Sequence, residues 1–156
     1  MEPNDTFLSE YFLSERDLDQ LMEYLVAEQS NAGTLLAFTD EIRLEPGQVL
    51  IRQGDSDAAV YILTEGTLEV LVEDGGKERP VAKVDAYALV GEQSFIDGAP
   101  RTATVVAHTD CVAHRLTDAA FEQVRDTNPD AACAFLIDVS RALAQRLRQR
   151  STAARS

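Results

Sequence analysis

The pattern of apolar and polar positions divides the chain into a helical beginning, a β-rich middle and a helical end. Between Ser14 and Glu28 apolar side chains recur at helical spacing, and Ser14 can cap this helix with Asp17 at its third position. Ser30 to Gly33 should interrupt it. Short runs rich in β-branched residues then follow, with about ten residues from one to the next, which predicts a sandwich, roll or barrel. These runs are 35–38, 41–44, 48–51, 59–63, 67–73, 80–84, 102–107 and 111–116.

The residues between the runs are suited to tight turns. Pro46-Gly47, Gly54-Asp55 and Glu65-Gly66 each supply a preset or left-handed backbone position, as does the Asp-Gly-Gly at 74–76. Antiparallel strands need such connections, so the middle of the chain is predicted to be an antiparallel sheet structure.

Helical patterning returns after residue 116. Thr117 and Asp118 can cap a short helix, and Asn128-Pro129-Asp130 opens a longer one with Pro129 at its first position. The apolar stripe of this last helix consists of Phe135, Leu136, Val139, Leu143 and Leu147. We expect the stripe either to pack on the β structure or to pair with a second copy of the chain.

The charge balance narrows the class of partner. The 156 residues carry 14 Lys and Arg against 27 Asp and Glu, a formal charge of −13. A surface this acidic repels a phosphate polymer, so DNA and RNA are not expected partners. The basic residues collect in the last part of the chain, where 141–156 contains five Arg and no acidic residue. Because no apolar run is long enough for a membrane span and the first ten residues lack the basic-then-apolar pattern of a signal peptide, we expect a cytoplasmic protein without membrane insertion.

Metal and nucleophile chemistry find little support in the sequence. Cys111 and Cys133 show no zinc-type spacing and are interpreted as small core residues. A metal enzyme built on a cupin-type roll would need more ligands than His108 and His114 provide, and no GxSxG motif for a hydrolase occurs. We therefore expect no catalytic residues, no metal and no resident cofactor.

One segment inside the β region departs from strand patterning. It reads GEQSFIDGAPRTATV from Gly91 to Val105 and combines a turn glycine, the carboxylate of Glu92, a polar-apolar turn and Arg101 before a strand. A short helix here would direct backbone N–H groups toward an anion, and Arg101 would add a guanidinium. Glu92 could accept hydrogen bonds from sugar hydroxyls. No acidic residue lies within three positions of Arg101, so an ion-pair partner would have to be Asp97 or a residue distant in sequence.

This segment resembles the phosphate-binding cassette of the cyclic-nucleotide-binding domain, the β-roll of the bacterial catabolite activator family and of the regulatory subunits of cyclic-nucleotide-dependent protein kinases. The resemblance rests on GE and PRTATV and extends from about Leu36 to Arg150. It implies a mainly β fold, an eight-stranded antiparallel jelly roll with an N-terminal helix and two C-terminal helices. Residues 1–33 would form the helical segment, 34–150 the roll with its closing helices, and 151–156 a basic tail.

The same resemblance implies a role for each residue of the segment. Glu92 would hold the ribose 2′-hydroxyl of cAMP or cGMP, and Arg101 its cyclic phosphate. Gly91 would allow the backbone turn. The remaining members of the implied ligand set are Gln93, Ser94, Thr102 and Ala103, with Arg150 and Ser151 as possible contacts to the base. Thr102 does not choose between the two nucleotides.

The segment also departs from the usual form of the cassette. Gln93-Ser94-Phe95 replaces an apolar-Ala-Leu run, and Asp85 or Ala86 stands where a glycine is common. Phe95 would either close the pocket or repack the core. Two hypotheses stay open: a sensor that signals through its C-terminal helices to a second copy or a partner protein, and a roll that has lost its ligand and serves as an interaction or dimerisation scaffold. The activators' helix-turn-helix module would need more residues than the six that follow Arg150.

Overall fold

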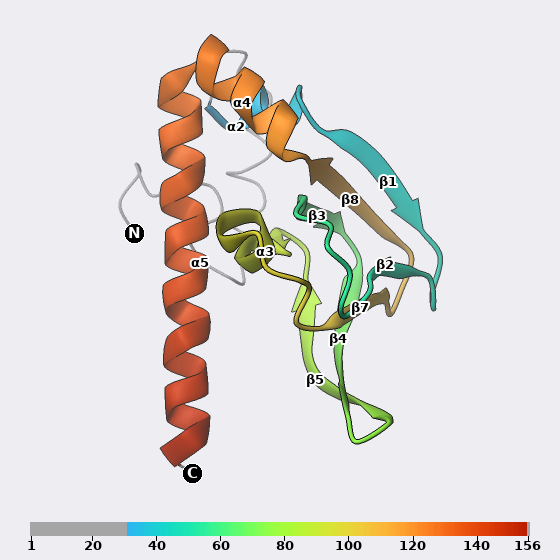
Figure 1. The fold of residues 1–156 in the computed structure, drawn as a ribbon. Helices are drawn as coiled ribbons and strands as arrows, with labels where there is room; N and C mark the ends of the chain where they lie inside the picture. Colours follow the sequence, from blue (N-terminus) through green and yellow to red (C-terminus); the bar gives the residue numbers. More distant parts are fainter. Residues whose placement is uncertain (1–30, 156) are drawn as a thin grey trace.

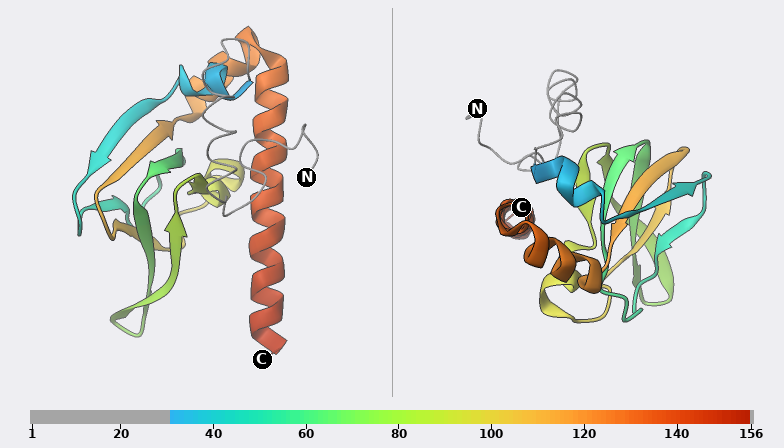
Figure 2. Two further views of the ribbon diagram at one scale, coloured as in Figure 1. Left: turned by 180° about the vertical axis from the view of Figure 1, so that it is seen from behind. Right: turned by 90° about the horizontal axis from the view of Figure 1, so that it is seen from above.

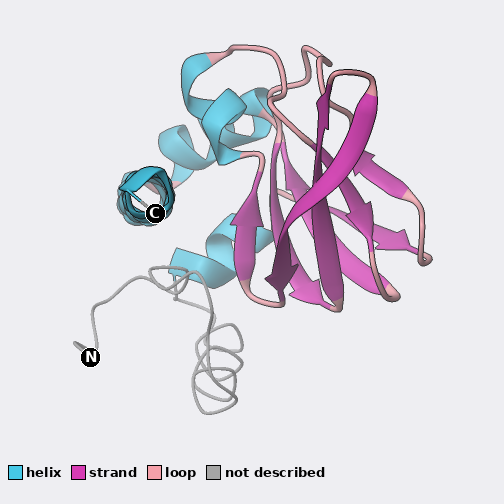
Figure 3. Cartoon of the chain, turned by 90° about the horizontal axis from the view of Figure 1, so that it is seen from below, coloured by secondary structure: helices cyan, strands magenta, loops and turns pink. Residues whose placement is uncertain are grey.

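The computed structural model describes the backbone of residues 31–155 and the side chains of residues 34–149. Within this part, eight antiparallel strands form a roll of two four-stranded sheets, and all helices lie on one side of it (Figures 1 and 3). The predicted fold class is therefore confirmed. The helix predicted between Ser14 and Glu28 lies outside the described residues.

Successive strands lie in different sheets, except for the hairpin of β4 and β5. One sheet has the order β1-β8-β3-β6 and the other the order β2-β7-β4-β5. The strands are β1 Asp40–Leu44, β2 Val49–Ile51, β3 Val60–Glu65, β4 Thr67–Asp74, β5 Lys77–Asp85, β6 Ala88–Val90, β7 Thr104–Ala107 and β8 Cys111–Leu116. β5 is an edge strand paired only with β4, so Pro80, which has no N–H to donate, interrupts no second ladder.

Four helices complete the described part of the chain: α2 Asn31–Leu36, α3 Glu92–Asp97, α4 Asp118–Thr127 and α5 Pro129–Arg155. The predicted caps are present, because the Thr117 side chain accepts a hydrogen bond from the N–H of Ala120 at 3.1 Å and Asn128 accepts one from Ala131 at 3.1 Å. Pro129 begins α5 as predicted. None of these helices is long and apolar enough to cross a membrane.

The prediction of a strand at 35–38 is wrong, and so is that of a break at 30–33 in its described part. Asn31 to Leu36 form α2, which ends in a turn where the N–H groups of Phe38 and Thr39 donate to the carbonyls of Leu35 and Leu36. A short apolar run without alternation fits a buried helical turn as well as a buried strand. β6 was not predicted, because a strand of only three residues does not stand out as a separate run in the sequence.

The core is one continuous cluster that extends from the inside of the roll to the helices. Three phenylalanines from different helices meet on its helical side: Phe95 of α3 packs edge-on against Phe121 of α4 at 5.5 Å and against Phe135 of α5 at 6.0 Å between ring centroids. Figure 2 shows α3 between the roll and α5 in both views. The cassette segment is thus held between the strands and the last helix.

The apolar stripe predicted for the last helix is split by its packing. Phe135 and Val139 are buried and Leu143 is partly buried, whereas Leu136 and Leu147 remain exposed. The N-terminal half of α5 therefore packs on the other helices, and its C-terminal half continues along the roll beyond α3 (Figure 1). Cys111 is buried as predicted, but Cys133 is exposed on α5, so its assignment to the core was wrong.

Candidate functional site

The cassette segment begins with the short helix α3, which lies between two glycines in the left-handed backbone region. Gly91 precedes it with φ 79° and Gly98 follows it with φ 69°. The Gly98 N–H donates to the carbonyl of Ser94 at 2.8 Å and closes the turn. Both reversals occur where the sequence has glycine, as the predicted turn at Gly91 requires.

The Arg101 guanidinium is buried next to Gly91, in a seat formed by the carbonyls of Gly91 and Ala59. The residue is 4% exposed, and its Nη1 donates to the Gly91 carbonyl at 2.9 Å while Nη2 donates to the Ala59 carbonyl at 2.5 Å. Nη2 also lies 3.3 Å from Oδ2 of Asp57. Burial alone would raise the pKa of Asp57, but the N–H of Ala59 and the Arg101 guanidinium hold it below its ordinary value. Asp57 is thus a carboxylate at neutral pH and anchors the guanidinium.

Backbone bonds fix the same region on both sides of Arg101. Its N–H donates to the Asp55 carbonyl at 2.8 Å, and its carbonyl accepts from the Gly54 N–H at 2.9 Å. The turn predicted at Gly54-Asp55 therefore docks on the end of the cassette and sets the position from which Arg101 extends.

Glu92, the first residue of α3, is completely buried. Its Oε1 accepts a hydrogen bond from Nη1 of Arg146 on α5, and Nη2 of Arg146 donates to the Leu89 carbonyl at 2.9 Å. Burial raises the pKa of Glu92 to about 7, while its own backbone N–H and the charge of Arg101 act in the opposite direction. The positive charge of Arg146 favours the carboxylate form.

Glu92 and Arg101 each have one polar side-chain atom that is buried without a hydrogen-bond partner in the described part of the chain. These atoms are Oε2 of Glu92 and Nε of Arg101. One is an acceptor and the other a donor. Gly91 links them, because it precedes Glu92 and its carbonyl binds Arg101. A buried polar group without a partner is unfavourable, so a ligand that offers a donor to Glu92 and an acceptor to Arg101 would relieve both.

The other residues of the predicted site surround this pair. Ser94 is buried, Gln93 and Ala103 are partly exposed, and Thr102 is exposed at the start of the segment that leads into β7. The side chains of Arg150 and Ser151 lie outside the described residues. The structure therefore places the Arg101 guanidinium in direct contact with Gly91, the residue that precedes Glu92.

Three features of the site were missed from the sequence. The partner of Arg101 is Asp57, which is 44 residues away, and not Asp97, which accepts a bond from the N–H of Ala99. The partner of Glu92 is Arg146, 54 residues away. Tyr87, ahead of the cassette, has a left-handed backbone with φ 64°, which the sequence did not indicate. Only the absence of a local acid near Arg101 had indicated that its partner would be distant.

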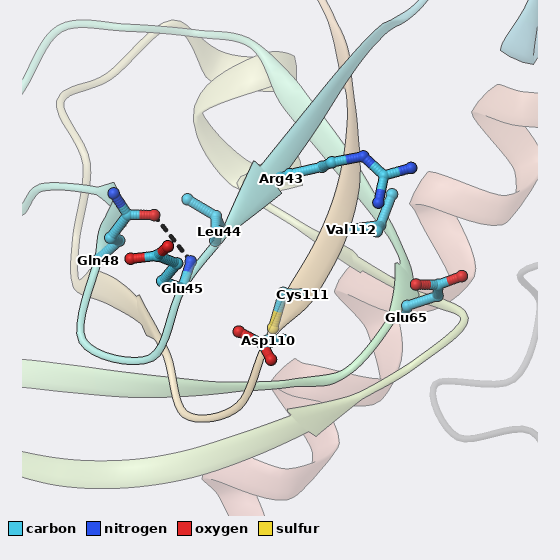
Figure 4. Close-up of a pocket in the computed structure, with 8 residues that line it drawn as sticks. All are labelled: Arg43, Leu44, Glu45, Gln48, Glu65, Asp110, Cys111 and Val112. Carbon is cyan, nitrogen blue, oxygen red and sulfur yellow. Dashed lines mark hydrogen bonds between the residues drawn. The ribbon is translucent and has the colours of Figure 1, made fainter.

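A cavity of about 570 Å³ lies elsewhere, between the ends of β1, β3 and β8 (Figure 4). Its carboxylates belong to Glu45, Glu65 and Asp110, and no residue of the cassette lines it. The described residues contain no group of three or more His, Cys, Asp or Glu side chains that could hold a metal ion. The cassette contains two buried charged residues, Glu92 and Arg101, and lies apart from this cavity.

Comparison with known proteins points to one family. A sequence profile described as the cyclic nucleotide-binding domain matches residues 41–128, more than half of the chain. The cAMP-dependent protein kinase regulatory subunit of Mucor circinelloides f. lusitanicus is 36% identical over 99 residues, which is 64% of this chain and 22% of that protein. The chain thus spans about a fifth of that relative.

Solved structures agree in fold. A cyclic nucleotide-binding domain from Methylobacillus flagellatus superposes with a TM-score of 0.74 at 23% identity, covering 86% of this chain and 80% of the other. The regulatory domain of Toxoplasma gondii PKA, crystallised with cAMP, superposes with a TM-score of 0.59 at 27% identity, covering 74% of this chain and 47% of the other.

Proposed function

Because the chain belongs to the cyclic nucleotide-binding domain family, we propose that it binds a cyclic nucleotide at the cassette and signals through its C-terminal helices. cAMP is the first ligand to test, since the Mucor relative is a cAMP-dependent kinase subunit and the Toxoplasma domain was crystallised with cAMP. cGMP is the second. The ligand set proposed from the sequence is kept: Gly91, Glu92, Gln93, Ser94, Arg101, Thr102 and Ala103, with Arg150 and Ser151 as possible contacts to the base.

The observation that carries this proposal is the pair of unsatisfied atoms beside Gly91. Oε2 of Glu92 is a buried acceptor and Nε of Arg101 a buried donor. A cyclic nucleotide presents a ribose hydroxyl that can donate and a singly charged phosphate that can accept. One such ligand would therefore offer a partner to each of the two buried atoms. Both hydrogen bonds would be strong, because Glu92 and Arg101 are charged.

The acidity of the chain does not oppose such a ligand. Surface charges beyond about 8 Å are largely screened at physiological salt, and a monomeric nucleotide carries one negative charge instead of a row of them. Arg101 is 4% exposed and anchored in its seat, so its field acts on the site with less screening than that of the surface carboxylates.

A second candidate function is supported by the same contacts. The Glu92 carboxylate is already bound by Arg146, and the Arg101 guanidinium by Asp57 and two carbonyls. A roll that has lost its ligand would be stabilised by internal partners of this kind and would serve as an interaction scaffold. Direct binding measurements separate the two functions.

The test is calorimetric titration of the chain with cAMP and with cGMP, with 5′-AMP as the non-cyclic comparison. We expect binding well below millimolar concentration, and a loss of roughly tenfold to a hundredfold in affinity for Arg101→Ala, because a charged hydrogen bond contributes about 1.5–3 kcal/mol. Arg43→Ala is the matched control, since Arg43 is an exposed arginine that pairs with Glu41 outside the cassette.

The outcomes separate cleanly. If the wild-type chain binds neither cyclic nucleotide below about millimolar concentration, the sensor function is rejected and the scaffold remains. If it binds one of them and Arg101→Ala binds equally well, the chain is a sensor but the ligand does not use this cassette.

We propose that a second copy of the chain binds the last helix and receives the signal. Leu136 and Leu147 are exposed by 37% and 65%, and with Ser140 and Leu143 they follow the 4-3-4 spacing of a two-helix seam. Sedimentation of the wild-type chain and of Leu147→Glu tests this: we expect a dimer that the variant dissociates. A monomeric wild-type chain would instead favour a separate partner protein.

A further inference from the structure

We infer that Arg146 is an intramolecular latch that covers the ligand-binding carboxylate of Glu92, and that a ligand must displace it. The latch is defined here as the two bonds of Arg146, one to Oε1 of Glu92 and one to the Leu89 carbonyl. The inference rests on the proposed function, since it concerns access to the same site. It concerns the regulation of that site by a residue that the implied ligand set does not contain.

Burial shows that the site is closed. The Glu92 side chain is 0% exposed, whereas that of Arg146 is 32% exposed, so the arginine is the member of the pair that faces solvent. No solute can reach the carboxylate in this arrangement without a movement. Because Nη2 of Arg146 is also bonded to Leu89, the middle residue of β6, the guanidinium bridges the strand and the start of α3.

Arg146 is a stronger hydrogen-bond donor to the Glu92 carboxylate than a sugar hydroxyl is. A guanidinium offers charge and several N–H donors to a carboxylate, whereas a ribose hydroxyl offers one neutral donor. The hydroxyl can reach the unpartnered oxygen Oε2 only after Arg146 has moved, because the Glu92 side chain is completely buried in this arrangement. The observed affinity is then the intrinsic affinity multiplied by the fraction of molecules with the latch open, so removal of Arg146 raises it.

The position of Arg146 on α5 links the latch to the rest of the helix. Val139 and Ala142 are buried, and the residues that follow are partly or fully exposed, with Leu147 at 65%. Arg146 therefore ties the weakly packed half of α5 to the first residue of α3 and to β6 of the roll. When the latch opens, this half of the helix loses two bonds to the roll, and its position comes to depend on the ligand.

The test compares Arg146→Ala, Arg146→Lys and the control Arg148→Ala by titration with cAMP. Arg148→Ala removes the same charge from an exposed position of the same helix. We expect Arg146→Ala to bind cAMP at least about fivefold more tightly than wild type, Arg146→Lys to lie between them, and Arg148→Ala to stay within about twofold. Equal or weaker binding by Arg146→Ala overturns the latch, because a residue that contacts or supports the ligand would lose affinity when truncated.

Amide hydrogen exchange without nucleotide provides the second readout. Arg146→Ala should accelerate exchange in the half of α5 after Ala142, relative to wild type and Arg148→Ala. If no variant binds a cyclic nucleotide, the proposed function fails, and the exchange data still decide whether Arg146 holds the helix. If wild type binds and neither affinity nor exchange changes, the latch fails and the sensor function stands. Circular dichroism checks folding, and Arg146→Lys keeps the charge should the alanine variant not fold.

Discussion

Replacement of Gly91 by alanine tests the geometry of the site most directly. Gly91 has φ 79°, and a Cβ added there would lie 2.6 Å from Nη1 of Arg101 and 3.1 Å from the Ala59 carbonyl oxygen. The left-handed backbone costs a non-glycine residue about 1 kcal/mol. The new methyl group also pushes the guanidinium off its seat, and the loss of a charged hydrogen bond costs about 2 kcal/mol. We expect Gly91→Ala to destabilise the fold by about 3 kcal/mol in total.

Gly98→Ala is the matched control at the other end of α3. Gly98 has a similar φ of 69°, but nothing lies within 4 Å of the added Cβ. The control therefore carries only the backbone cost of about 1 kcal/mol. The difference of about 2 kcal/mol between the variants isolates the contact with Arg101. Urea unfolding at fixed pH measures it, and titration with cAMP should show at least a tenfold loss for Gly91→Ala with little change for Gly98→Ala.

Equal effects of the two substitutions would refute this reasoning. Such a result would mean that Arg101 yields to the methyl group without cost, and that its bonds to Gly91 and Ala59 do not fix the guanidinium. A large loss of stability without loss of affinity would show that the seat is structural and lies apart from the ligand.

Two further predictions concern Glu92 and Phe95. Since burial raises the pKa of Glu92 to about 7, the folded state holds this proton more tightly than the unfolded chain, and the resulting stability is lost as the pH rises through about 7. Between about pH 5.5 and about pH 8.5, the free energy of unfolding of wild type should therefore fall by about 2 kcal/mol relative to Glu92→Gln, and a constant difference would contradict the assignment. Phe95→Leu should cost about 1–2 kcal/mol by loosening the contacts with Phe121 and Phe135, while cAMP affinity stays within about threefold. A clear gain in affinity would instead mean that Phe95 closes the pocket.

Local chemistry made most of the fold predictable. The cap at Thr117, the proline at the start of α5 and the turn glycines act within a few residues, so their effects can be seen in the sequence directly. Runs rich in β-branched residues and bounded by turn residues identified seven of the eight strands of the described structure. The same criterion failed for Leu35, which lies in α2, and for β6, which has only three residues, because so short an apolar run does not distinguish a strand from a helical turn.

The candidate site was predictable in its motif and unpredictable in its partners. Gly91, Glu92 and Arg101 lie within eleven consecutive positions, and their spacing is that of a known cassette. Asp57 and Arg146 reach the site from β3's preceding loop and from α5, at separations of 44 and 54 residues. Nothing in the local sequence around Arg146 distinguishes it from the other arginines of the last helix. Only the packing of α5 against α3 brings it to the buried carboxylate.

The length of α5 gives the junction at Asn128 a mechanical consequence. The helix has 27 residues and so extends about 40 Å from that junction. The N–H of Asn128 bonds to Val124 and its side chain to the N–H of Ala131, so the end of α4 and the start of α5 meet in one capped corner. A rotation of only about 10° at this corner would carry the far tip of a rod of that length through about 7 Å. The helix therefore works as a lever arm, in which a change smaller than an ångström beside the corner becomes a displacement as wide as a side chain at the tip.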